Sequence, residues 1–203
     1  MDKIESNTEE KIFNAATEIF ITKGFDGARM QDIADFAGIN KAALHYYYRS
    51  KKRLFDAVFE KIANQILSRL VFVLDENLTL EEKIKYFFRE HISFLQNNPT
   101  LPTFVVNELN RNPEKIKKFI QKINLKELGS KLENQHKEEL ENYNITKETI
   151  PMLIVSIAAL CVFPFVDRVL IESVMKEIGY NFDDYMVKRK EHLSDFVIKA
   201  ILK

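Results

Sequence analysis

Hydrophobic side chains recur along the chain at intervals of three and four residues, with no stretch of strict alternation. This period is typical of amphipathic helices, whereas half-buried strands alternate every second residue. The sequence therefore predicts an all-α fold, with helices over residues 6–22, 30–37, 41–47, 51–74, 79–97, 102–109, 114–141, 147–164, 167–176 and 183–202. An interruption is expected near Gly129 in the seventh of these, and Pro164 is expected to bend or end the eighth.

A tight turn between two short helices is the most distinctive local pattern. Ile33 and Ala37 lie on one face of the first helix. Gly38 supplies the left-handed conformation that ends a helix at low cost, and Asn40 has the short polar side chain that caps the next helix. The pattern predicts a helix-turn-helix whose second helix runs from Lys41 to Tyr47.

The second short helix has residues suited to a DNA major groove. Leu44 and Tyr48 are its inward anchors, and small residues at its leading edge permit close approach. Tyr46, Tyr47 and Tyr48 point about 100° apart, so one core cannot bury all three. We expect base-edge contacts from Arg29, Gln31, Ala42, Ala43 and His45, and phosphate contacts from Lys41, Tyr46, Tyr47 and Lys51, with Asn40 at the helix cap.

Over roughly residues 10–58 the chain resembles the TetR (tetracycline-repressor-like) family of transcriptional regulators. The resemblance rests on positions at fixed spacing: Ala15-Ala16, Phe20, Gly24-Phe25, Ile33-Ala34, Ala37-Gly38-Ile39, Leu44, Tyr48, Ser50-Lys51 and Leu54. The family often has Thr or Ser just ahead of the motif's first helix. Here those places hold Ala28, Arg29 and Met30, so the usual cap is absent.

The resemblance implies two domains and a function. A three-helix DNA-binding domain is expected over residues 1–52, joined by a long helix to a helical-bundle domain over residues 53–203 for ligand binding and dimerisation. The implied protein is a homodimer that binds a near-palindromic double-stranded DNA operator through the Lys41–Tyr47 helix. It is a repressor, and a small-molecule effector of unknown identity releases it.

Net charge, cysteine content and the distribution of apolar residues argue against several classes of protein. The net charge is zero, which argues against a constitutive DNA-packaging protein, but residues 29–53 hold six basic and two acidic residues. A single cysteine fits a reducing cytoplasm, and the charged amino terminus has no secretory pattern. Residues 149–166 carry no charge. They are at the short end of a membrane span and contain two prolines, so a buried core or interface helix is the better interpretation.

The effector site is expected among the helices around residues 60–165, where aromatic walls mix with a few polar groups. The candidates are Ile66, Phe88, His91, Phe104, Asn107, Glu108 and Cys161. This set predicts a mostly apolar ligand, cationic or neutral. Three alternatives stay open: His91 as a core histidine, Glu108 as a solvated charge or a partner of Arg111 or Arg89, and a core filled solidly by the sixteen Phe.

The predicted helices over residues 147–164 and 183–202 have more hydrophobic surface than one subunit can bury. This predicts a dimer interface of four helices, two from each subunit. Its candidate residues are Leu153, Ile157, Leu160, Leu193, Phe196, Val197, Ala200 and Ile201. No catalytic grouping, metal-ligand spacing or phosphate-binding glycine loop occurs, so we expect no enzyme activity, no cofactor and no metal. The competing hypothesis is a helical enzyme or lipid carrier with an appended DNA-binding domain.

Overall fold

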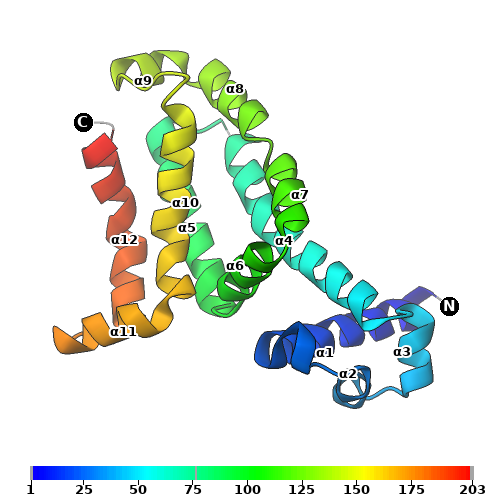
Figure 1. Cartoon of the computed structure of the whole chain (residues 1–203). Helices are drawn as coiled ribbons and strands as arrows, with labels where there is room; N and C mark the ends of the chain where they lie inside the picture. The colour runs from blue at the N-terminus through cyan, green and yellow to red at the C-terminus, as the bar shows by residue number, and fades with distance from the viewer. Residues whose placement is uncertain (1, 76, 202–203) are drawn as a thin grey trace. The chain divides into compact units, whose positions relative to one another are not determined.

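The computed structural model describes the backbone of residues 2–75 and 77–201 and the side chains of residues 7–69, 77–124 and 126–200. Every regular element in these ranges is a helix, which confirms the all-α prediction (Figure 1). In chain order they are α1 (Asp2–Gly27), α2 (Met30–Ala37), α3 (Lys41–Tyr47), α4 (Lys51–Asp75), α5 (Leu80–Asn97), α6 (Leu101–Arg111), α7 (Pro113–Ile123), α8 (Leu125–Gln135), α9 (Lys137–Asn142), α10 (Ile150–Val166), α11 (Arg168–Glu177) and α12 (Phe182–Ile201).

Two compact units divide the chain, Met1–Asn64 and Gln65–Lys203. The division falls inside α4, whereas the sequence-based boundary after residue 52 lies near the start of that helix. The reason is aromatic packing, because the ring of Phe55 meets Phe20 at 4.8 Å and Phe25 at 5.0 Å between centroids, both edge-on. The first half of α4 therefore completes the core of the first unit, and one continuous helix contributes to both units.

The first unit is built by α1, α2, α3 and the beginning of α4. Ile12, Phe20, Ile33 and Leu44 are fully or almost fully buried in its core. α1 begins at Asp2, earlier than predicted, and Gly24 has a φ of 66° and a non-helical ψ of 177°. The regular part of α1 therefore ends at the glycine that the sequence indicated.

The second unit has one continuous core, to which α5, α8, α9, α10 and α12 all contribute. α5 lies against both α10 and α12 (Figure 1). α5 begins with a capping box, because Thr79 Oγ1 accepts from the backbone N–H of Glu82 while Glu82 Oε2 accepts from that of Thr79. Phe88, Phe165 and Met186 are among the side chains that fill the centre.

The predicted helix over residues 114–141 is three helices, and the predicted break at Gly129 is wrong. α7 ends at Asn124, which adopts the left-handed conformation with φ 46° and whose side chain caps α8. Asparagine tolerates this conformation because its short side chain bonds locally. Gly129 lies inside α8, where a Cβ atom would lie 3.5 Å from the side chain of Ile150. That distance is an ordinary van der Waals contact, so Gly129 simply continues α8, and His136 separates α8 from α9.

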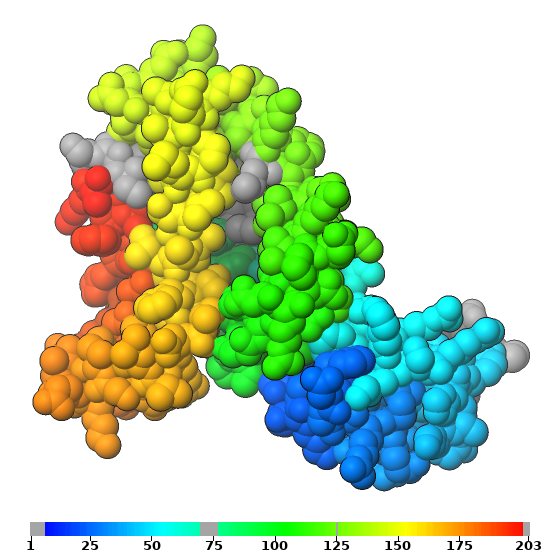
Figure 2. All heavy atoms as spheres, viewed as in Figure 1, coloured from blue at the N-terminus to red at the C-terminus, as the bar shows by residue number. Residues whose placement is uncertain are grey.

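α10 is apolar on nearly every side. Ile150 and Cys161 are buried in the core, whereas Met152, Val155 and Phe163 are exposed. Figure 2 shows α10 uncovered along much of its length on the viewed face. Among the described residues no single helix is long and apolar enough to cross a membrane, and α10 with α11 meets that test only as a pair bent by 81°.

The predicted dimer residues fall into two groups. Leu153, Leu193 and Val197 are buried in the subunit's own core, and Ile157 and Leu160 are half-buried. Phe196, 65% exposed, and Ala200 face solvent, whereas the side chain of Ile201 lies outside the described residues. Helical period assigned these positions to one stripe, but α5 covers one side of α12 and leaves the other open. The uncovered apolar surface therefore includes Phe196 but not its buried neighbours.

An arginine of α12 donates the hydrogen bond that a proline removes from α10. Pro164 has no backbone N–H, so the carbonyl of Leu160 loses its donor within the helix. Arg189 Nη2 of α12 donates to that carbonyl at 2.7 Å, and Arg189 Nη1 donates to Tyr185 Oη at 2.9 Å. α10 consequently continues past the proline to Val166.

Arg189→Met should lower the free energy of unfolding by about 2 kcal/mol, because a charged donor is lost and a carbonyl is left without its partner. In a Pro164→Ala background the new N–H can bond Leu160 within the helix, so the same change should cost about 1 kcal/mol less. Urea unfolding of the four proteins measures this coupling. Equal costs in both backgrounds would show that Arg189 does not substitute for the missing helical bond.

Candidate nucleic-acid interface and effector site

The turn between α2 and α3 has the predicted geometry. Gly38 is left-handed, with φ 67° and ψ 32°, and its N–H donates to the carbonyl of Asp35 at 3.2 Å. Ile39 N–H donates to the carbonyl of Ala34 at 3.0 Å. Asn40 Oδ1 then accepts from the backbone N–H of Ala43 at 2.7 Å and caps α3. Two helix ends are thereby satisfied within one short connection, which fixes the direction of α3.

α3 presents one face to the core and the rest to solvent. Leu44 is fully buried, as predicted. Lys41, Ala42 and His45 are exposed, and Ala43 is half-buried. The exposed face therefore starts with a cation and a methyl group and continues with an imidazole. These groups can contact phosphates, thymine methyl groups and base edges in a major groove.

The three tyrosines have three different environments. Tyr46 is 80% exposed, and its ring meets the half-buried ring of Tyr47 edge-on at 5.5 Å between centroids. Tyr48 lies at the end of α3, where burial, and secondarily the charge of Glu9, raise the pKa of its hydroxyl. Tyr46 therefore faces outward, as the argument from helical geometry required, whereas Tyr48 packs toward the interior.

Lys51 has a structural role that the sequence did not indicate. Its Nζ donates to the carbonyl of Ala28 at 3.0 Å and to that of Asp26 at 3.3 Å, and it lies 4.6 Å from the ring centroid of Phe25. An ammonium has three donors, so one N–H remains for a phosphate. Removing Lys51 therefore affects the connection before α2 as well as any phosphate contact.

The beginning of α2 is held by side-chain pairs. Arg29 occupies the N-cap position without a side-chain capping bond, and it is exposed. Lys23 Nζ and Asp32 Oδ2 are 2.6 Å apart, and this hydrogen bond is the main cause that lowers the pKa of Asp32. Gln31 Nε2 donates to Asp35 Oδ1 at 2.7 Å, which orients an exposed amide. The guanidinium of Arg29 and the amide of Gln31 are thus both presented to solvent near α3.

Four of the predicted effector residues belong to the core of the second unit. Phe88, His91, Phe104 and Cys161 are all buried. His91 stacks on Phe87 with 4.5 Å between ring centroids, and burial, followed by the charge of Arg69, lowers the pKa of His91 to about 4. Burial raises the pKa of Cys161 to about 12, so its thiol stays protonated. These properties are those of core residues.

The other three predicted residues differ from one another in burial. Ile66 is half-buried, and Asn107 is exposed. Glu108 Oε1 accepts from Lys115 Nζ at 2.7 Å, and both side chains are largely buried. The partner of Glu108 is thus on α7, whereas Arg111 and Arg89 were the expected partners. The sequence did not indicate Lys115 as the partner of Glu108, because only the turn between α6 and α7 brings the two side chains together.

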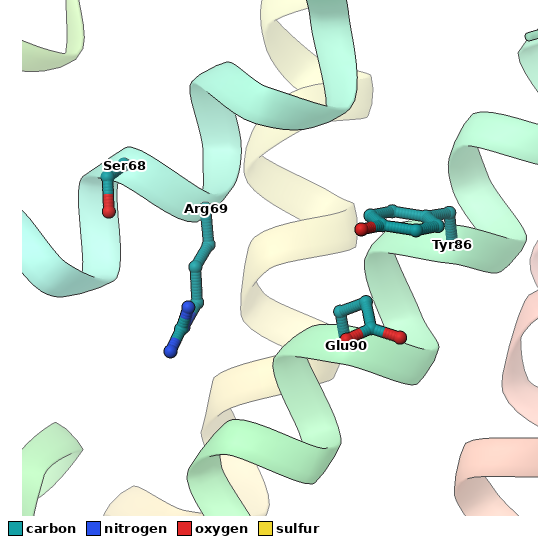
Figure 3. A pocket seen from close by; sticks show the side chains of 4 residues that line it. All are labelled: Ser68, Arg69, Tyr86 and Glu90. Carbon is teal, nitrogen blue, oxygen red and sulfur yellow. The ribbon is translucent and has the colours of Figure 1, made fainter. Parts of the chain in front are cut away.

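A cavity of about 370 Å³ lies on a different set of side chains, Ser68, Arg69, Tyr86 and Glu90 (Figure 3). None of them was in the predicted set. Tyr86 and Glu90 are four residues apart on α5, so they share one face, and Ser68 and Arg69 lie on α4 opposite them. Within the described ranges no group of three or more His, Cys, Asp and Glu residues could hold a metal ion.

Comparison with known proteins identifies the first unit. Residues 12–58 match the family described as bacterial regulatory proteins, tetR family. The negative transcriptional regulator IcaR of the Staphylococcus epidermidis icaADBC biofilm operon is 28% identical over 81 residues, which are 40% of this chain and 44% of that protein. The chain spans about half the length of the curated relatives it matches.

Solved structures share the fold of the whole chain. A proposed regulator of fatty acid metabolism from Clostridium perfringens superposes with a TM-score of 0.70 at 21% identity, over 95% of this chain and 99% of that one. The transcriptional regulator FadR from Bacillus subtilis, in complex with stearoyl-CoA, has a TM-score of 0.66 at 19% identity and the same coverage. The order of a helix-turn-helix unit followed by a helical unit is therefore shared.

Lys41 and Lys51 give a matched pair of substitutions. Lys41→Met should reduce the slope of log affinity against log salt concentration by about one, because one phosphate contact is lost, and should leave thermal stability unchanged. Lys51→Met should lower the melting temperature as well, since it removes the bonds to Asp26 and Ala28. Fluorescence anisotropy at several salt concentrations and calorimetry measure the two effects. An unchanged slope for Lys41→Met would exclude a phosphate contact by that ammonium.

Proposed function

Because this chain belongs to the TetR family of bacterial regulatory proteins, we propose that it is a ligand-responsive transcriptional repressor that binds DNA as a homodimer. The observation that carries the proposal is the α2–α3 pair, in which a glycine turn and an asparagine cap present the exposed face of a seven-residue helix. α3 enters the major groove at one half of a near-palindromic operator. Arg29, Gln31 and His45 read base edges, and Lys41, Tyr46 and Lys51 bind phosphates.

The dimer forms through the outward faces of α10 and α12. Met152, Val155 and Phe163 on α10 and Phe196 on α12 are large apolar side chains left exposed by the subunit. A two-fold axis through this surface pairs four helices and covers these side chains. Binding to both half-sites then requires the two α3 helices to lie roughly 34–36 Å apart, the spacing of successive major grooves on one side of DNA.

A small, mostly apolar effector bound in the second unit relieves repression. It acts by binding more tightly to an arrangement of the dimer that does not fit the operator. α4 is suited to transmit this change, because its residues belong to both units. The FadR structure with stearoyl-CoA supports a ligand-binding role for this fold.

Selection from random duplexes tests the DNA-binding role. The protein should enrich a near-palindromic sequence whose half-sites are one helical turn apart, and binding should weaken steeply with salt. His45→Ala should alter the preferred bases, because this exposed side chain is placed at base edges. Failure to enrich any sequence, or binding that does not depend on salt, would reject the proposal. A reporter gene placed behind the enriched sequence distinguishes repression from activation.

The double substitution Val155→Asp and Phe196→Asp should give monomers, because it places four charges in the paired interface. Operator affinity should fall by more than tenfold, since each half-site then binds alone. Val169→Asp is the matched control, because Val169 is 78% exposed on α11, outside this surface. Light scattering measures the mass of each variant. If the double variant remains dimeric, the subunits associate through another surface.

A further inference from the structure

Arg69 is an arginine whose side chain is not fully satisfied. Its Nε atom is buried without a hydrogen-bond partner, and no carboxylate of the described residues lies within ion-pair distance of the guanidinium. The guanidinium carbon lies 4.0 Å from the ring centroid of Phe94 on α5. An unpaired buried donor on a charged group is costly, so such groups normally have a partner.

The cavity described above places open space beside this guanidinium. It is lined by Ser68 and Arg69 from α4 and by Tyr86 and Glu90 from α5. Figure 3 shows Arg69 and the hydroxyl of Tyr86 extending into the region between the two helices. The volume of about 370 Å³ falls within the range typical of small-molecule sites. Arg69 therefore places a positively charged side chain beside a space large enough for a ligand.

We propose that this cavity binds a small organic anion, whose carboxylate or phosphate group is held by Arg69. The identification rests on the proposed ligand-responsive function and names the ligand class of its effector. A guanidinium matches the planar geometry of a carboxylate or phosphate edge, and charge-assisted bonds of this kind are stronger than neutral ones. The sequence favoured a cationic or neutral effector because it revealed no inward cation, and Arg69 is that cation.

Glu90 limits the charge of the ligand. Its carboxylate also borders the cavity, and Oε1 accepts from Arg89 Nε at 3.1 Å on the exposed side of α5. A carboxylate at the rim repels an anion at short range, so a monoanion is preferred over a dianion. Hexanoate should accordingly bind better than hexyl phosphate, which carries more negative charge at neutral pH.

The test uses the full chain with four six-carbon probes of one length: hexanoate, hexyl phosphate, hexanol and hexylamine. Calorimetry should show that the two anions bind and that hexanoate binds more tightly than hexyl phosphate. Hexylamine should not compete with either anion. Arg69→Met should weaken hexanoate at least tenfold, and Arg69→Lys, which keeps the charge, should weaken it less. Arg111→Met is the control, because Arg111 is exposed on α6 and lies outside the cavity lining. Glu90→Gln should tighten both anions, with the larger gain for hexyl phosphate.

Two outcomes overturn the proposal: hexanoate affinity unchanged by Arg69→Met in a protein that still melts cooperatively, or binding of hexylamine in place of the anions. Saturating hexanoate should weaken operator binding by the parent and not by Arg69→Met. Operator binding without any probe is measured separately, so failure of DNA recognition is distinguishable from failure of this site.

Discussion

The position of α3, the helix that we propose reads DNA, depends on the turn between α2 and α3 and on one buried side chain. A helix of seven residues is far too short to be stable alone, so α3 depends on its surroundings. Gly38 turns the chain, Asn40 accepts from the backbone N–H of Ala43, and Leu44 anchors the helix in the core. With its position fixed by these three residues, α3 leaves Lys41, Ala42, His45 and Tyr46 exposed to solvent.

The turn between α2 and α3 could be predicted from the sequence because its interactions are local. Caps and turns involve residues three or four positions apart, so their signals are adjacent in the chain. Asn40 caps α3 and Thr79 opens α5 as the sequence predicted, and Ser50 accepts from the N–H of Arg53 at the start of α4. The outward position of Tyr46 followed from helical geometry alone.

Features that depend on tertiary neighbours could not be read in this way. Helical period places Leu193 and Phe196 on one apolar stripe, yet only packing against α5 decides that the first is buried and the second exposed. Gly129 and Asn124 are both capable of ending a helix, and it is Asn124 that adopts the left-handed conformation while Gly129 stays helical. Nothing in the sequence around Arg69 distinguishes it from other arginines. Its Nε is unsatisfied because no acceptor among the described residues lies within reach in the folded chain.

The bond between Arg189 and the Leu160 carbonyl has a consequence for how related chains vary. Proline at position 164 is tolerated because a guanidinium on α12 takes the role of the missing N–H. The two positions are therefore energetically linked although they lie on different helices. In relatives of this chain, replacement of the proline should release position 189 to vary, while loss of the arginine beside a retained proline should be rare. Covariation of positions 164 and 189 in an alignment of relatives would then indicate the contact between α10 and α12 without any structure.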